Sequence, residues 1–473
     1  MSAQGGMVFS SFTFLFLFLP LVLVINRWLP LFWSNLFLLV ASLFFYYLGE
    51  GSLVLLLVGS ITWNYGFGRW IPYLKSPIWK KVVVGICVVG NIGLLLYYKY
   101  LLFFLENIGW IDLLSPEILA DWVLPIGISF FTFQGVSYIL DVSWGQEKAE
   151  RSWIRLGLYI ALFPQLIAGP IVKFNEIQTY LRSRVIQTNQ MVSGVQQAIR
   201  GLVKKVLLAN QFALVADAVF KTSADNLSTP IAWLGLLAYT LQIYFDFSGY
   251  SDMAIGLCRV MGFEIPENFR HPYIARSIRA FWRRWHISLS SWFRDYLYIP
   301  LGGNQKSIFR TYFNLFVVFL ITGLWHGASW NFVIWGLLHG LFLILERARW
   351  IPVDRFPPWL GHLYTLLVVV GTWVFFRIEA LDESLVFWQQ LLFWKPSGDP
   401  YVLLFLQPYF WLIFLAGVLL VTPIRSQVEG WWLARAPLAW RWGILVSVYV
   451  GLFYLCLMEL SITSYSPFIY FKF

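Results

Sequence analysis

Long apolar runs recur along the whole chain and are separated by short polar loops. A membrane-spanning helix needs about 20 predominantly apolar residues. The pattern therefore predicts candidate spans, besides one longer central run, at residues 8–25, 31–48, 52–68, 82–105, 122–141, 154–172, 195–216, 231–247, 363–376, 401–421 and 442–460. We interpret the chain as an all-α, polytopic integral membrane protein with about 11 transmembrane helices plus re-entrant and interfacial helices.

The central run, residues 311–346, is too long for one simple crossing and contains a break at Trp325-His326-Gly327-Ala328. Basic residues flank both of its ends, and cytoplasmic loops carry an excess of Lys and Arg, so both ends are expected on the cytoplasmic side. The flanking residues are Lys306, Arg310, Arg347 and Arg349. We therefore predict two segments that meet near residues 323–327, with His326 near the membrane midplane.

The segment 154–172 raises the same question, because the basic loops before and after it both look cytoplasmic. It contains Pro164 and the turn Ala168-Gly169-Pro170. We predict that this segment dips into the membrane and returns. Non-helical backbone is tolerated at that depth only where protein or a wet cavity surrounds it.

Composition supports a membrane protein and excludes other classes. The chain is 59% hydrophobic, 20% aromatic and 12% charged, with a mean hydropathy of +0.68. The net charge of +10 does not indicate a nucleic-acid partner, because the basic residues lie in short loops rather than on one solvated face. The three cysteines are scattered, so we expect neither a disulfide framework nor a metal site.

The most basic stretch, residues 259–310, contains aromatic residues at helical spacing around His286. Those residues are Trp282, Trp285, Leu289, Trp292 and Tyr296. One interpretation is an interfacial amphipathic helix that binds lipid phosphates and places its Trp residues in the interfacial belt. The other is a cytoplasmic mouth where Arg side chains hold the phosphates of a donor such as coenzyme A.

Buried titratable groups supply the candidate chemistry. A histidine at membrane depth is a functional-site hypothesis, against the alternative of a satisfied structural histidine, and His326 is the principal case. His339 follows thirteen residues later, about 220° round a regular helix, and is not expected at the site. Asp246 and Asp252 lie in another apolar run, where hydrogen bonding to backbone or Arg is the main alternative to a ligand site.

The sequence has no G-x-S-x-G, Walker or H-E-x-x-H motif. One deep histidine, one interfacial histidine and a basic aromatic mouth suit acyl transfer from a thioester. In that reaction a histidine acts as general base on an acceptor hydroxyl, and a second group or a backbone N–H stabilises the oxyanion.

Several motifs resemble those of a known family. FWRRWHISLSSWFRDYLYIPLGGN (281–304) and LWHGASWNFVIWG (324–336) are similar to the two hallmark regions of the membrane-bound O-acyltransferases. PIGISFFTFQ (125–134), FPQLIAGPI (163–171), YFDFSGYSDMAIG (244–256) and PFIYFKF (467–473) resemble the bacterial polysaccharide branch, which includes alginate O-acetylation. The resemblance runs from about Met7 to the last residue. We expect one membrane domain, residues 1–473, in which residues 1–6 are an extra start or an unstructured lead.

The resemblance implies roles for individual residues. His326 matches the near-universal family histidine and His286 a second one, so both are expected to be catalytic. We expect contacts with substrate or donor from Trp285, Trp325, Arg283, Arg284 and Asp246.

The resemblance also implies a donor and partners. The expected donor is acetyl-CoA from the cytoplasmic side, with no permanently bound cofactor or metal. The acyl group is expected to pass, at the bacterial inner membrane, to a periplasmic or surface esterase-like partner that modifies a polysaccharide.

Three alternatives stay open at this point. Within the same class, the acyl group is D-alanyl or another group, and the acceptor is teichoic acid or peptidoglycan. In a second class, the chain is a transporter or flippase whose His and Asp residues relay protons. In a third, it is a scaffold for a surface assembly, and both histidines are replaceable.

Overall fold

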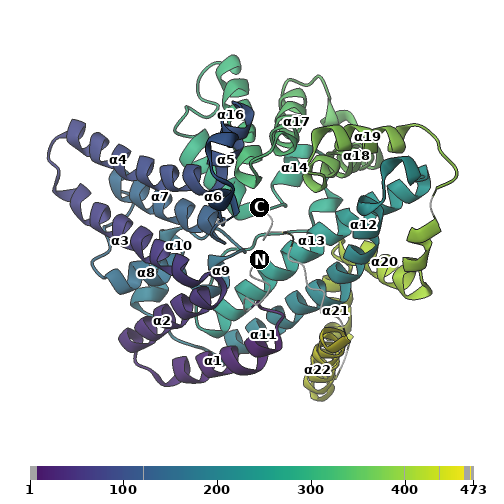
Figure 1. Cartoon of the computed structure of the whole chain (residues 1–473). Coiled ribbons are helices and arrows are strands. Elements are labelled where there is room, and N and C mark those ends of the chain that lie inside the picture. Colours follow the sequence, from purple (N-terminus) through teal and green to yellow (C-terminus); the bar gives the residue numbers. More distant parts are fainter. Residues whose placement is uncertain (1–7, 121, 399, 436, 463–468, 470–473) are drawn as a thin grey trace. The chain divides into compact units, whose positions relative to one another are not determined.

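The computed structural model describes residues 8–120, 122–398, 400–435, 437–462 and 469. Every regular element in these residues is a helix (Figure 1), which confirms the all-α prediction. The chain forms two compact units, Met1–Ala198 with Asp252–Pro266, and Ile199–Ser251 with Glu267–Phe473. Residues 1–6, the expected lead, lie outside the described residues. Whether both units act as the single domain predicted from the sequence stays a prediction.

The first unit packs helices from the N-terminal part of the chain. Its elements are η1 (Phe14–Phe18), α1 (Leu19–Trp28), α2 (Leu31–Glu50), η2 (Gly51–Leu53), α3 (Val54–Trp70), η3 (Ile71–Tyr73), α4 (Pro77–Leu95), η4 (Leu96–Tyr100), α5 (Leu101–Asn107), η5 (Ile111–Leu113), α6 (Pro116–Ala120), α7 (Ile128–Trp144), α8 (Trp153–Ala161), α9 (Phe163–Leu166) and α10 (Phe174–Arg182). Buried amides help to join these helices: Asn64 of α3 and Asn91 of α4 exchange two hydrogen bonds of 3.0 Å. Gly135 of α7 passes so close to Asn64 that a Cβ there would lie 2.5 Å from its Nδ2.

The second unit carries both predicted catalytic histidines. Two helices, α11 (Thr188–Val203) and α13 (Thr229–Val260), contain a boundary between the units. The other elements are η6 (Lys204–Ala209), α12 (Asn210–Lys221), η7 (Ala224–Asn226), η8 (Pro272–Ile274), α14 (Ile278–Trp282), α15 (Ile287–Phe293), η9 (Arg294–Tyr298), α16 (Ile308–His326), α17 (Trp330–Arg347), η10 (Val353–Arg355), α18 (Pro358–Arg377), α19 (Leu381–Leu392), η11 (Pro400–Phe405), α20 (Pro408–Leu420), α21 (Ile424–Arg435) and α22 (Leu438–Ile462).

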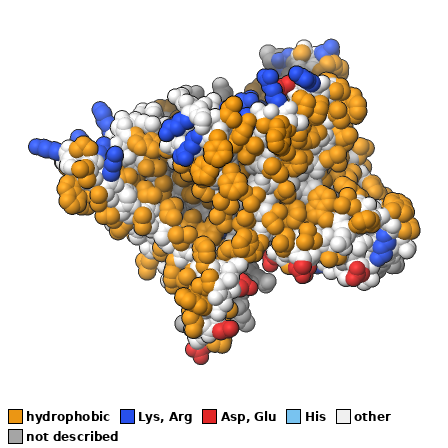
Figure 2. All heavy atoms as spheres, turned by 90° about the horizontal axis from the view of Figure 1, so that it is seen from above, with side chains coloured by type: hydrophobic (Ala, Val, Ile, Leu, Met, Phe, Trp, Pro, Cys, Tyr) orange, Lys and Arg blue, Asp and Glu red, His pale blue; other side chains and the backbone are white. Residues whose placement is uncertain are grey.

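Five helical stretches among the described residues are long and apolar enough to cross a membrane, or six if a bent pair counts as one span. They are Leu31–Tyr73, Pro77–Asn107, Ile308–His326, Pro358–Arg377 and Trp440–Ile462, and the bent pair is Pro408–Leu420 with Ile424–Trp432. Hydrophobic side chains cover much of the face in Figure 2, with Lys and Arg in small separate groups, as expected for a lipid-facing surface. The membrane character is thus clear, whereas the count of about 11 crossings stays a prediction, because several expected spans do not form a separate stretch that is both long and apolar enough.

The segment 154–172 turns back on itself within the first unit; that it dips into the membrane stays a prediction. Helix α8 has nine residues and rises about 14 Å, roughly half the hydrocarbon thickness. After α9 the chain turns at Gly169, whose φ is +111°. The returning backbone then lies beside α8, where the Tyr159 hydroxyl donates to the Val172 carbonyl at 3.2 Å.

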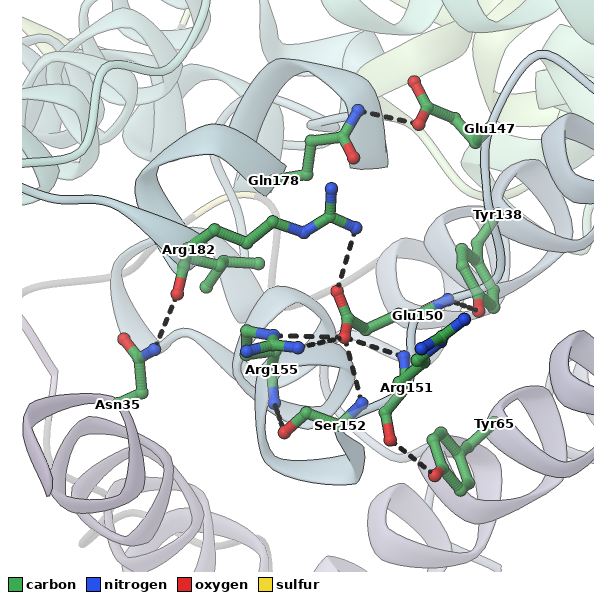
Figure 3. Close-up of polar contacts among 11 residues, drawn as sticks. Asn35, Tyr65, Tyr138, Glu147, Glu150, Arg151, Ser152, Arg155, Gln178 and Arg182 are labelled. Carbon is green, nitrogen blue, oxygen red and sulfur yellow. Dashed lines mark hydrogen bonds and ion pairs between the residues drawn. The ribbon is translucent and has the colours of Figure 1, made fainter. Parts of the chain in front are cut away.

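A buried carboxylate fastens the two ends of this segment (Figure 3). Glu150, 1% exposed, accepts from the backbone N–H groups of Arg151 and Ser152 at 2.7 and 2.9 Å. Its two oxygens also meet Arg155 on α8 at 2.7 Å and Arg182 on α10 at 3.2 Å. Because Arg155 lies at the start of the segment and Arg182 follows its end, one carboxylate holds the two ends together.

The protonation of Glu150 follows from these contacts. Burial alone raises the pKa of the carboxyl, but hydrogen bonds from Arg155 and Ser152 outweigh burial and hold the pKa below its ordinary value. A lowered folded-state pKa stabilises the fold above the unfolded pKa, and this contribution is lost as the pH falls through the folded value.

We expect Glu150→Gln to destabilise the protein by about 1–3 kcal/mol, because two half-exposed guanidinium groups lose their anion. The stability of the wild type should fall as the pH drops below about 4.5, because Glu150 becomes protonated, and the variant should show a smaller fall. Thermal unfolding in detergent across this pH range measures both effects.

Glu147→Gln is the matched control. The Glu147 carboxylate accepts one hydrogen bond, from Gln178 at 2.7 Å, so its replacement should change stability by less than about 0.5 kcal/mol. Equal effects of the two substitutions would contradict a fastening role for Glu150.

Candidate active site

The central run forms a hairpin of two helices, as predicted. Ser307 caps the start of α16 by accepting from the Arg310 N–H at 3.2 Å. Helix α16 ends at His326, Gly327 is extended, and α17 begins at Trp330. Because α17 packs back along α16 over most of its length, both basic ends lie at the same end of the hairpin.

Glycines allow the two helices to touch. A Cβ on Gly323 would lie 2.3 Å from the Phe332 carbonyl oxygen, and one on Gly336 would lie 2.3 Å from that of Phe319. Small residues at a helix interface permit such close backbone approach in membranes. The hairpin turn, and therefore His326, is held by this contact.

The depth of His326 stays a prediction. Helix α16 has 19 residues, which corresponds to about 28 Å of rise, close to the hydrocarbon thickness of about 30 Å. An untilted α16 that starts at one membrane face would carry His326 past the midplane.

His326 lies in an aromatic enclosure. Its side chain is 1% exposed, and three rings contact it: Trp325, Trp335 and Phe376, with ring centres 4.9, 4.9 and 5.0 Å away. Trp335 and Phe376 come from α17 and α18, so three helices enclose the imidazole. Such an enclosure excludes bulk water from the predicted base.

His286 is fully buried and held by an amide. Its Nδ1 lies 3.2 Å from Asn268 Oδ1, which also accepts from the Ser288 backbone N–H at 3.3 Å. Since that N–H can only donate, the Asn268 atom is an acceptor, and neutral His286 carries its proton on Nδ1. The lone pair of Nε2 is therefore directed away from Asn268.

The structure brings the two predicted catalytic histidines together through one indole. The Trp325 ring centre lies 5.7 Å from that of His286 and 4.9 Å from that of His326. Trp325 is 4% exposed. The predicted substrate residue Trp325 thus separates two imidazoles that are 40 positions apart in sequence.

The prediction of an amphipathic helix around His286 is wrong, because the stretch does not form one continuous helix. Helix α14 ends at Trp282, and α15 begins only after His286, whose φ is +46°. That left-handed conformation cannot occur inside an α-helix. Trp282, Trp285 and Trp292 are also buried at 7%, 2% and 6% exposure rather than lying in an interfacial belt, and Trp285 packs against Trp373.

A cavity of about 410 Å³ lies beside this break. Its lining includes three exposed arginines, Arg279, Arg283 and Arg294, which form the rim, and the buried Trp282, Phe319 and Thr322, which lie deeper. Thr322 precedes His326 by one turn of α16, so the cavity reaches toward the aromatic enclosure. A basic rim above an apolar interior is the arrangement that an acyl thioester with phosphate groups requires.

The arginines differ from the prediction in one case. Arg283 lines the cavity, whereas the Arg284 guanidinium donates to the Arg270 carbonyl at 3.1 Å and is absent from the lining. Arg279 and Arg294, which belong to the same basic stretch but were not singled out as site residues, line it as well. A hydrogen bond from Arg294 to Asp295 keeps the pKa of that guanidinium above its ordinary value, so Arg294 stays cationic.

Asp246 has protein partners. Its carboxylate pairs with Lys205 Nζ at 2.5 Å and accepts from the Ile469 backbone N–H at 2.9 Å. Helix α13 continues through Gly249, so Asp246 and Asp252 do not share a face. These contacts match the hydrogen-bonded alternative, although Lys takes the place expected for Arg. The next residue, Phe247, contacts His286 with ring centres 4.7 Å apart.

His339 is the residue that sequence reasoning missed. The angle of 220° assumed one continuous helix, and the hairpin invalidates it. Trp335 contacts both His326 and His339, with ring centres 4.9 and 5.0 Å away. The four-residue spacing of Trp335 and His339 on a separate helix after the Gly327 break was the signal that could have located it.

The described part of the chain contains no group of three or more His, Cys, Asp or Glu side chains placed to hold a metal ion.

Comparisons with known proteins identify the family of this chain. The model of the membrane-bound O-acyltransferase family matches residues 150–378, which include His286 and His326. The chain is 40% identical to a probable alginate O-acetylase, AlgI, of Pseudomonas putida, across 99% of this chain and 100% of that protein. It is 38% identical to a peptidoglycan O-acetyltransferase of Helicobacter pylori, across 80% and 78%. A teichoic acid D-alanyltransferase of Bacillus subtilis is 27% identical across 53% and 68%.

We expect Gly336→Ala to destabilise the protein by about 1–3 kcal/mol and to lower activity, because the new methyl group must push α17 away from α16. Gly451→Ala is the control, since nothing lies within 4 Å of a Cβ added there in α22. That change should be neutral or stabilising by up to about 1 kcal/mol. Thermal unfolding in detergent compares the two, and a Gly336→Ala protein as stable as wild type would contradict the close contact.

Proposed function

Because the chain belongs to the membrane-bound O-acyltransferase family, we propose that it takes an acetyl group from acetyl-CoA and passes it across the bacterial inner membrane for O-acetylation of an extracytoplasmic polysaccharide such as alginate. That the protein is a membrane-bound O-acetyltransferase follows from its relatives, and it replaces the transporter and scaffold alternatives. The donor, the direction of transfer, the polymer and the partner are the content of the proposal.

One observation carries the proposal: a basic-rimmed cavity reaches one helical turn from a buried histidine that shares an indole with a second histidine. The rim arginines suit the phosphates of coenzyme A, because guanidinium groups bind phosphate through paired N–H donors. The apolar interior suits the pantetheine arm and the acetyl group. The basic ends of the α16–α17 hairpin support a cytoplasmic position for this rim.

His326 is the proposed general base. Its imidazole takes the proton of the acceptor hydroxyl while the oxygen attacks the thioester carbonyl. The tetrahedral intermediate then collapses, the C–S bond breaks, and the leaving thiolate takes the proton back from the imidazolium. The aromatic enclosure keeps water from competing with the acceptor.

Two nearby groups have supporting roles in this scheme. His286 carries its proton toward Asn268, so its Nε2 is an acceptor that can orient a hydroxyl or thiol. The Trp335 N–H is buried and has no hydrogen-bond partner among the described residues, and its ring contacts His326. We assign this N–H to the developing oxyanion, which needs a donor at that point.

The acceptor side of the proposal includes a partner protein. An esterase-like periplasmic or surface protein would receive the acetyl group and modify the polymer. The names of the similar proteins from Pseudomonas putida and Helicobacter pylori support an O-acetylated cell-envelope or exported polysaccharide as the final acceptor.

We expect His326→Ala to lower the transfer of labelled acetyl from acetyl-CoA by about 100-fold or more in proteoliposomes, because a general base contributes about 10²–10⁴-fold. His362→Ala is the matched control. The His362 Nδ1 lies 3.2 Å from the Ala275 carbonyl, outside the proposed site, so that variant should keep wild-type transfer.

Two results would change the proposal. Wild-type transfer by a well-folded His326→Ala protein would remove the general-base role. A wild-type protein that is inert with acetyl-CoA but active with a carrier-borne D-alanyl group would favour the D-alanyl alternative, which the similarity to the Bacillus subtilis protein supports.

A further inference from the structure

We propose that Trp282 closes the inner end of the basic-rimmed cavity, that His339 is the positioning residue that holds it there, and that this pair limits the length of the transferred acyl group. The inference rests on the proposed function, because it concerns the donor of that same site.

Trp282 lies between the cavity and Trp335. Its ring lines the cavity together with Phe319, and their ring centres are 5.1 Å apart. On its other side it contacts Trp335, with ring centres 5.8 Å apart. Trp335, which contacts His326, is absent from the cavity lining. The Trp282 indole therefore covers the Trp335 side of the cavity's inner end, whereas Thr322, one helical turn before His326, lines the side that leads to the imidazole.

His339 determines the orientation of that wall. The Trp282 N–H donates to His339 Nδ1 at 3.3 Å. A Trp N–H can only donate, so the neutral imidazole carries its proton on Nε2. Nε2 lies 3.0 Å from Thr372 Oγ1, and the Thr372 hydroxyl donates to the Val369 carbonyl at 3.0 Å. The hydrogen bonds thus run in one direction from Trp282 through His339 to the backbone of α18.

Burial makes these hydrogen bonds costly to break. His339 is fully buried and Trp282 is 7% exposed, so neither group can exchange its partner for water without a cost. The His339 ring is also packed against Trp282 and Phe281, with ring centres 5.3 and 6.2 Å away. A rotation of Trp282 away from the cavity would leave both its N–H and His339 Nδ1 without a partner.

A fixed wall has a direct consequence for specificity. The reacting carbonyl must reach His326, so the methyl end of the acyl group must fit against the side chains that close the cavity. Acetyl ends at one methyl group, whereas butanoyl adds two methylenes that meet the Trp282 indole. Rejection of one or two methylenes by a rigid wall changes selectivity by at least about tenfold.

The test compares acetyl-CoA with butanoyl-CoA as labelled donors in proteoliposomes that contain the full-length protein. Trp282→Leu and His339→Leu should each raise the butanoyl-to-acetyl rate ratio by about tenfold or more. The double variant should show no larger change, because both substitutions remove the same wall. His339→Asn, whose amide oxygen can replace Nδ1 as acceptor, should keep a ratio near that of wild type.

His362→Leu is the matched control for loss of a histidine, and it should leave the ratio unchanged. A parallel measurement uses binding of S-ethyl and S-butyl pantetheine, unreactive thioethers that lack the nucleotide. Their affinity ratio should shift in the same direction in the two leucine variants. This readout stays valid if acetyl-CoA proves not to be the donor, so failure of the proposed function and failure of this inference give different results.

Three outcomes would overturn the inference. One is a His339→Leu protein with a lowered melting temperature but wild-type rate and affinity ratios, which would make His339 a residue of the core alone. Another is a Trp282→Leu protein with an unchanged ratio. The last is a wild-type protein that binds neither thioether, since the cavity would then not receive an acyl thioester.

Discussion

The contact between α16 and α17 is the constraint on which the candidate site depends. Backbone meets backbone where Gly323 faces Phe332 and Gly336 faces Phe319, and no larger residue fits at either glycine without separating the helices. This contact ends α16 at His326 and places Trp335 of α17 against that imidazole. It also brings His339 to the other side of Trp335. A helix pair without these glycines would stand farther apart and would not enclose the histidine.

Burying imidazoles is costly, and the fold meets that cost by giving the rings defined partners. His286 faces the amide oxygen of Asn268, and His339 lies between an indole N–H and a hydroxyl. Each arrangement determines one neutral tautomer, because the partner atoms can act only as acceptor or only as donor. Neutral, oriented imidazoles are what proton transfer in a water-poor site requires, since a group already protonated cannot act as a base.

Charged and uncharged contacts occupy different parts of the fold. Charged contacts hold loops, where water is near: Glu150 joins both ends of the segment 154–172 through Arg155 and Arg182. Within the helices the contacts are amides and glycines, such as the Asn64–Asn91 pair and the Gly135–Asn64 approach. An ion pair is tolerated inside only where both partners are present, as for Lys205 and Asp246. This division follows from the cost of an unpaired charge in an apolar medium.

The sequence by itself determined the helical class, the membrane setting and the family, because apolar run length, loop charge and motif spacing are local properties. It also led to the prediction of His326, His286, Trp325 and Arg283 as site residues, since each lies within a recognisable motif. Only the tertiary structure decided which side chains meet. The break at His286 depends on a left-handed residue that periodicity conceals, and the roles of His339, Asn268, Arg279 and Arg294 depend on contacts between helices. An angle counted along one helix cannot describe residues that a hairpin brings back together, and for that reason His339 became visible only in the fold.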